Sequence, residues 1–154
     1  MTRTLVGVIG AGSADAELYE LARALGAGLA TAGLAVVNGG LGGVMEASAR
    51  GAVEAGGLTV GILPGSLASD ANPWIQVPVV TDMAHARNVV IANTAQVVVA
   101  VGGSHGTRSE VSIALKLGRP VISLHSFDFD PAIQVVQTAE EAVAAVVAAL
   151  GDGG

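Results

Sequence analysis

The chain has 154 residues, of which 51% are hydrophobic and only 13% are charged, so it is long and apolar enough for one globular domain and is not intrinsically disordered. Its formal net charge of −6, with seven dispersed cations, argues against nonspecific binding of nucleic acid. The sequence has no cysteine, which excludes disulfides and thiolate metal sites.

Short β-branched runs alternate with Ala- and Leu-rich segments of helical period along the chain. The predicted strands lie near residues 4–9, 35–38, 58–63, 77–80, 96–101 and 120–124, and the predicted helices near 14–31, 43–55, 83–93, 107–117 and 138–150. Because the strands are apolar on both faces and alternate with helices, residues 1–150 are predicted to form a single-domain, Rossmann-like α/β fold. This fold is a doubly wound parallel sheet with helices on both faces. Residues 151–154 are predicted to be a frayed tail.

Three further expectations follow from composition. The sparse charge and the Ala/Val-rich helices leave little polar surface, so we expect a homodimer or homotetramer. No apolar run reaches the roughly 18 residues of a membrane span and no signal-peptide cleavage site follows the N-terminus, so we expect a cytoplasmic protein without a membrane partner. The three histidines lack metal-binding spacing, so we expect no metal site.

In open parallel sheets, ligands bind at the carboxyl ends of the strands, so the turns that follow the strands are the informative ones. The first such turn holds Gly10, Gly12 and Ser13 and begins like a dinucleotide-binding fingerprint. Asp15 stands where the third glycine of that fingerprint should be, and its carboxylate would repel a pyrophosphate. NAD binding is therefore a weak hypothesis, although the sugar or base of a nucleotide could still rest on this turn.

The second turn places four glycines, Gly39, Gly40, Gly42 and Gly43, between a strand and the start of a helix. Its backbone N–H groups could bind an anion. Equally, the glycines could allow two turns to pack closely against each other. The sequence favours neither interpretation.

The third turn, GGSHGTRSE at 102–110, follows the apolar run AQVVVAV. Thr107 and Glu110 match a T-x-x-E capping box, which would account for both residues without any ligand. The same turn would expose helix N-terminal amides beside glycines, where a phosphate could bind, and His105 could donate to it. Arg87, on the preceding predicted helix, is the natural charged neighbour of this turn; alternatively, it is an ordinary solvated helix arginine.

Four ordered motifs, GGLGGVMEA at 39–47, TVGILPGS at 59–66, MAHARN at 83–88 and GGSHGTRSE at 102–110, resemble a known superfamily. This superfamily of Rossmann-like proteins includes the Lonely Guy cytokinin-activating phosphoribohydrolases, once labelled lysine decarboxylases, and the molybdenum cofactor carrier proteins. The resemblance covers roughly residues 4–125. The glycine-rich GGLGGVMEA motif and the ARN of 86–88 look closer to the carrier-type branch.

The resemblance also implies roles for residues. The phosphoribohydrolases carry P-G-G-x-G-T-x-x-E and an upstream arginine, and their catalytic pair matches Arg87 and Glu110, with Arg87 keeping Glu110 ionised. Their phosphate-binding glycines and threonine match Gly103, Gly106 and Thr107. The chain departs from that motif at Gly102, where the hydrolases have proline, and at Ser104, where they have glycine.

The resemblance therefore implies first a carrier that binds a phosphate-bearing ligand, with the molybdenum cofactor as a possible ligand and no cofactor required. The alternative is a nucleoside 5′-monophosphate phosphoribohydrolase that cleaves the N-glycosidic bond with Arg87 and Glu110, and a nucleotide sensor ranks third. The predicted ligand-binding residues are Gly10, Gly12, Ser13, Gly39, Gly40, Gly42, Gly43, Arg87, Gly102, Gly103, Ser104, His105, Gly106 and Thr107.

Overall fold

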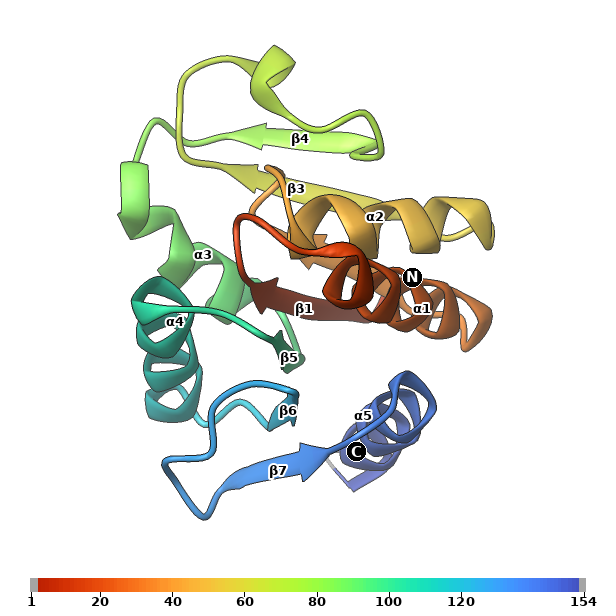
Figure 1. The fold of residues 1–154 in the computed structure, drawn as a ribbon. Helices are drawn as coiled ribbons and strands as arrows, with labels where there is room; N and C mark the ends of the chain where they lie inside the picture. The colour runs from red at the N-terminus through yellow and green to blue at the C-terminus, as the bar shows by residue number, and fades with distance from the viewer. Residues whose placement is uncertain (1–2, 153–154) are drawn as a thin grey trace.

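The computed structural model describes residues 3–152, which form one twisted, all-parallel sheet with the strand order β4-β3-β2-β1-β5-β6-β7 (Figure 1). The strands are β1 (Leu5–Gly10), β2 (Ala35–Asn38), β3 (Thr59–Leu63), β4 (Val77–Val80), β5 (Val97–Val101), β6 (Val121–Leu124) and β7 (Ile133–Val136). The helices are α1 (Ala16–Thr31), α2 (Val44–Glu54), α3 (Arg87–Thr94), α4 (His105–Lys116) and α5 (Ala139–Asp152), with short 3₁₀ turns η1 (Ala68–Asp70) and η2 (Ala84–Ala86).

Helices cover both faces of the sheet. Val6 and Val8 of β1 pack with α1, α2 and α5, whereas Ile9 of the same strand packs with α3 and α4. Figure 1 shows the two helical layers on opposite sides of β1 and β5. The central strands are buried on both faces, which explains why their sequences are continuous apolar runs. The predicted doubly wound, Rossmann-like fold is confirmed.

The structure differs from the predicted elements in several places. The helix predicted near 83–93 is instead the 3₁₀ turn η2 followed by α3, which begins at Arg87. Ile133–Val136 form an edge strand, β7, in a segment that the prediction left irregular. Helix α4 begins two residues earlier than predicted, at His105. Helix α5 continues to Asp152, two residues into the tail that was expected to fray, and residues 153–154 of that tail lie outside the described residues.

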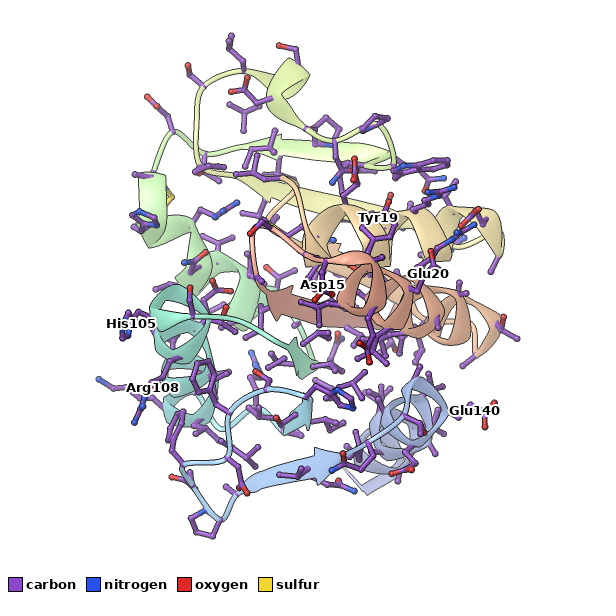
Figure 2. All side chains as sticks on the ribbon, in the orientation of Figure 1. Asp15, Tyr19, Glu20, His105, Arg108 and Glu140 are labelled. Carbon is purple, nitrogen blue, oxygen red and sulfur yellow. The ribbon has the colours of Figure 1, made fainter. Side chains whose placement is uncertain are left out.

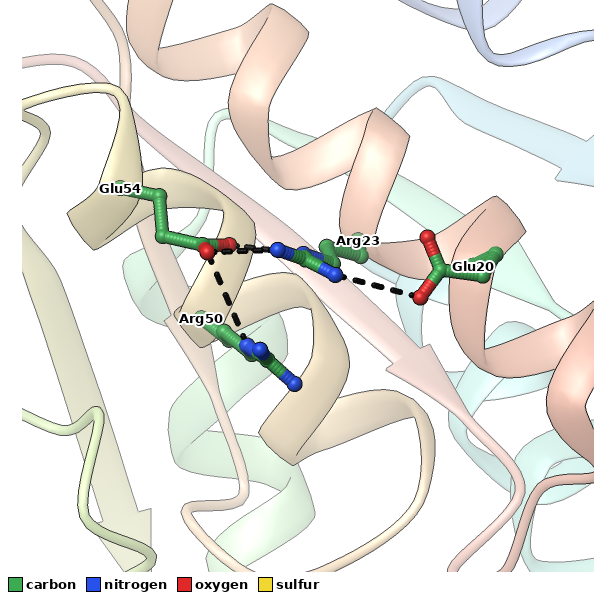
Figure 3. A network of polar contacts seen from close by, with 4 residues as sticks. All are labelled: Glu20, Arg23, Arg50 and Glu54. Atoms are coloured by element: carbon green, nitrogen blue, oxygen red, sulfur yellow. Dashed lines mark hydrogen bonds and ion pairs between the residues drawn. The ribbon is translucent and has the colours of Figure 1, made fainter.

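A polar network on the surface joins α1 to α2 (Figure 3). The Nε and Nη2 atoms of Arg23 donate to the two carboxylate oxygens of Glu54 at 2.7 and 2.6 Å, and Nη1 donates to Glu20 at 3.3 Å. Arg50 lies beside Glu54 and also 5.4 Å from the centre of the Trp74 ring. The network therefore ties both helices to the loop between β3 and β4.

The chain direction reverses at β1. It leaves β1 through α1 toward β2 on one side, and returns through α3 to β5 on the other side. In open parallel sheets, this reversal opens a crevice at the carboxyl ends of the two central strands, where ligands bind. The first and third glycine turns lie at this point, after β1 and β5. Within residues 3–152, no helix combines the length and hydrophobicity needed to cross a membrane.

Candidate functional site

The first and second glycine turns pack against each other. The Val44 amide donates to the Ala11 carbonyl at 2.9 Å. Gly43 has a positive φ of 63°, and a Cβ atom there would lie 2.3 Å from the same carbonyl oxygen. A Cβ atom on Gly42 would lie 3.2 Å from the Gly12 carbonyl oxygen. These contacts are the close packing that one interpretation of the second turn predicted.

Hydrogen bonds within the protein also occupy several backbone N–H and carbonyl groups of the second turn. The Asn38 side chain accepts from the Gly40 amide and donates to the Met45 carbonyl, both at 2.8 Å. From the β3–β4 loop, Asn72 donates its amide to the Gly40 carbonyl and its side-chain NH₂ to the Leu41 carbonyl, again at 2.8 Å. The hydrogen bonds of Asn38 and Asn72 therefore hold the second turn in one conformation.

The first turn is partly open. The Asp15 carboxylate caps α1 by accepting from the Leu18 amide at 2.8 Å, so this helix N-terminus already has an acceptor. Gly10 lies where β1 approaches β5, and a Cβ atom on it would be 2.2 Å from the Val101 carbonyl oxygen. Gly12 and Ser13 are exposed, and a Cβ atom on Gly12 would meet no atom within 4 Å.

The predicted capping box in the third turn is wrong. Ser104, not Thr107, is the N-cap of α4, and its side chain makes no capping hydrogen bond. Thr107 is buried and packs against Gly103, whose φ of 115° is accessible mainly to glycine. With the helix starting at His105, Glu110 lies in the second helical turn, too far along the helix to reach back to the N-cap amide.

The third turn leaves the N-terminus of α4 open. Ser104, His105 and Gly106 are exposed, and the first intrahelical backbone bond comes from the Arg108 amide to the Ser104 carbonyl at 3.0 Å. The N–H groups that precede it therefore carry the partial positive charge of a helix N-terminus without a side-chain acceptor. Figure 2 shows the side chains of His105 and Arg108 at the surface of this helix.

Arg87 is buried, with 8% of its surface exposed, so the solvated-arginine alternative is wrong. Its Nη1 atom donates to the Ile62 carbonyl at 2.6 Å and to the Gly39 carbonyl. A Cβ atom on Gly39 would be 2.8 Å from this Nη1 atom, which explains why residue 39 has no side chain. The Nε atom of Arg87 is buried and makes no hydrogen bond within the described residues.

Glu110 and Arg87 share a small cavity behind the crevice. The cavity has a volume of about 50 Å³ and is lined by Val8, Ile9, Gly10, Gly39, Met45, Arg87, Asn88, Ile91 and Glu110. Burial raises the pKa of Glu110 to about 7, and the attraction of Arg87 offsets this rise only in part. No ion pair within 4 Å joins the two side chains, both of which the structure describes. Arg87 thus favours the ionised form of Glu110, as expected, but burial opposes that form more strongly.

The prediction missed the loop that follows β6. His125, Ser126 and Phe127 form a cavity of about 200 Å³ together with Gly102 and Gly103 of the third turn. A signal was present, because HSFDFD directly follows a predicted parallel strand and so belongs at the same edge of the sheet. Within the described residues, no group of three or more His, Cys, Asp or Glu side chains is placed to hold a metal ion.

Comparisons with known proteins agree with this architecture. The model of the SLOG cluster4 family matches residues 3–150. A protein from Archaeoglobus fulgidus is 47% identical over 138 residues, covering 90% of this chain and 91% of that protein.

Solved structures also match nearly the whole chain. The molybdenum cofactor binding protein of Rippkaea orientalis is 31% identical, with a TM-score of 0.92, covering 97% of this chain and 99% of that one. The molybdenum cofactor carrier protein of Chlamydomonas reinhardtii is 33% identical, with a TM-score of 0.91 and the same coverage. The resemblance to the carrier-type superfamily is confirmed.

Proposed function

The chain belongs to the SLOG cluster4 family, and on this premise we propose that it is a carrier that binds a phosphate-bearing ligand at the N-terminus of α4. The observation that carries this proposal is the difference among the three glycine turns. Asp15 caps the helix after the first turn, and Ala11 accepts the first amide of the helix after the second. The helix after the third turn has exposed amides without a capping side chain, which suits an anion.

The surroundings support an anion at this place. Arg108, the fourth residue of α4, makes no ion pair within residues 3–152 and brings a positive charge to the same end of the helix. The exposed Gly12 and Ser13 of the first turn lie across the β1–β5 crevice and complete the proposed site.

The molybdenum cofactor, a phosphorylated pterin that carries molybdenum, is the ligand that we propose. Two solved relatives that match the chain along its length, from Rippkaea orientalis and Chlamydomonas reinhardtii, are a molybdenum cofactor binding protein and a molybdenum cofactor carrier protein. The site then holds its ligand without breaking a bond. A preformed surface suits this task, since a carrier needs no stronger contact with a transition state than with the ligand itself.

A second candidate function is N-glycosidic hydrolysis of a nucleoside 5′-monophosphate. The observation that favours it is the shared cavity of Arg87 and Glu110, because a buried carboxyl group with a pKa near 7 is suited to acid–base chemistry. The hydrogen bonds of Arg87 argue against hydrolysis. Its Nη1 atom donates to the carbonyls of Gly39, in the second turn, and of Ile62, near the end of β3, so this atom already has a structural role.

The variant Gly106→Ala tests the phosphate site. A Cβ atom at residue 106 meets no protein atom within 4 Å, and alanine favours the helix, so stability should rise by roughly 0.5–1 kcal/mol. We expect the added methyl group to hinder the approach of a phosphate to the exposed amides beside it. Calorimetric affinities for ribose 5-phosphate, AMP and, under anaerobic conditions, the molybdenum cofactor should therefore fall by on the order of tenfold, or about 1.4 kcal/mol.

The matched control is Ser112→Ala, an exposed change on the same helix that should leave these affinities unaltered. If Gly106→Ala also leaves them unaltered, the phosphate does not bind at the N-terminus of α4. Binding of AMP without binding of the molybdenum cofactor would retain the phosphate site and reject the proposed ligand.

A further inference from the structure

A second recess adjoins the proposed phosphate site. The cavity of about 200 Å³ lies between the third glycine turn and the loop after β6, and the Ser126 hydroxyl joins its two walls by donating to the Gly102 carbonyl at 2.5 Å. His125 lines this cavity and also a larger one, of about 430 Å³, whose other lining residues are Asp15, Glu17, Leu18 and Leu21. Together the two recesses fall within the range of about 300–1,000 Å³ that small-molecule sites occupy.

One wall of the smaller cavity is aromatic. The chain has two phenylalanines, and both lie in the loop after β6 although the buried core consists of Ala, Val, Leu and Ile. The Arg108 guanidinium lies 4.8 Å from the centre of the Phe129 ring and 6.0 Å from that of Phe127. These cation–π contacts hold the loop against α4, and Phe127 remains at the cavity wall.

The backbone that places this wall is unusual. His125 has a φ of 55°, in the left-handed region that residues other than glycine adopt rarely. Its Nε2 atom lies 2.9 Å from the Gln137 carbonyl oxygen, which holds the ring in place. Strained non-glycine residues of this kind concentrate at sites that hold a ligand. The loop therefore has a fixed shape beside the glycine turn.

We propose that this cavity receives a planar heteroaromatic ring, which stacks on Phe127 while the phosphate of the same ligand lies on the amides of α4. This inference rests on the proposed function and specifies where the ring of its phosphorylated ligand, a purine or a pterin, lies and which residue binds it. Charge sets the direction of binding, because Asp15 and Glu17 line the neighbouring cavity and repel a phosphate there. The uncharged end of the ligand therefore lies toward Leu18 and His125, and the phosphate lies toward Arg108.

The test compares three probes, AMP, neopterin monophosphate and ribose 5-phosphate, the last of which has no ring. Phe127→Leu keeps an apolar side chain but removes the aromatic face. It should lower the affinity for AMP and for neopterin monophosphate by on the order of tenfold, since stacking of a base on an aromatic side chain contributes about 1–3 kcal/mol. The affinity for ribose 5-phosphate should not change. The ratio of the two ring-bearing affinities tells whether the cavity prefers a purine or a pterin.

Val135→Ala is the control, because Val135 is exposed on the edge strand β7 and does not line the cavity. It should leave all three affinities close to those of the unmodified protein. A second measurement needs no variant: stacking on Phe127 should shift the H2 and H8 proton resonances of bound AMP upfield.

The outcomes separate the two proposals. Equal affinity for AMP and ribose 5-phosphate, no upfield shift, or no effect of Phe127→Leu on either ring-bearing probe would overturn the stacking inference and leave the phosphate site intact. Failure of all three probes to bind would overturn the phosphate site, and the ring site with it.

Discussion

Glu110 lines the same cavity as Arg87, yet burial outweighs the attraction of that guanidinium and raises the pKa of Glu110 from 4.5 to about 7. The carboxyl group therefore gains and loses its proton near neutral pH in the folded protein. In the unfolded chain it would be ionised above pH about 4.5. The difference makes protein stability depend on pH.

Glu110→Gln should stabilise the protein at pH 8 more than at pH 5. Between pH about 4.5 and 7 the folded state holds a proton that the unfolded state has released, so the stability of the unmodified protein falls as pH rises through this window. Glutamine has no such proton to lose. Urea unfolding at the two pH values should give a gain that is larger at pH 8 by on the order of 1–3 kcal/mol. A gain that does not change with pH would contradict burial as the cause of the raised pKa.

Gly103→Ala should destabilise the fold. Gly103 has a φ of 115°, and a Cβ atom on it would lie 2.5 Å from the side chain of the buried Thr107. Both backbone strain and overlap oppose alanine, so unfolding free energy should fall by about 2 kcal/mol or more. Thermal or urea denaturation measures the loss, with Gly106→Ala as the comparison at an unhindered position. Unchanged stability in Gly103→Ala would mean that the third turn is looser than its contacts indicate.

The unmodified protein should be a homodimer or homotetramer in solution. Exposed apolar side chains on the α3–α4 side of the sheet, Met83, Val89 and Leu117, are 45%, 41% and 40% exposed, and they add to the sparse charge of the chain. Light scattering at micromolar concentration measures the mass. A mass near the 15.1 kDa of one chain would reject this prediction.

The sequence predicted the fold well because each central strand is a continuous apolar run and each helix has its own apolar period. It missed β7 because Ile133–Val136 is a short edge strand that follows an irregular segment with Pro131. The start of α4 was placed late because Thr107 and Glu110 match a capping pattern, whereas the backbone bends at Gly102 and Gly103 allow the helix to begin at His105.

The sequence predicted that the glycine turns lie at the carboxyl edge of the sheet, because each turn directly follows a parallel strand. It could not predict the burial of Arg87, which depends on carbonyl groups of residues 39 and 62, far away in the chain. It could not predict the raised pKa of Glu110 for the same reason: desolvation by side chains from other elements produces it.

The last prediction distinguishes the carrier from the hydrolase through the ligand chemistry of Glu110→Gln. Glutamine keeps the shape of the side chain in the 50 Å³ cavity but removes the negative charge that an oxocarbenium-like ribosyl centre would need. A hydrolase should lose most of its turnover and still bind AMP, since that charge acts chiefly in the transition state. A carrier should release no adenine from AMP even when unmodified, and its variant should bind AMP equally well or more tightly because one repelling carboxylate is gone. We expect the carrier outcome, measured by chromatography of the released base and by calorimetry of both proteins. Steady release of adenine by the unmodified protein, abolished in Glu110→Gln, would assign the cavity of Arg87 and Glu110 to catalysis.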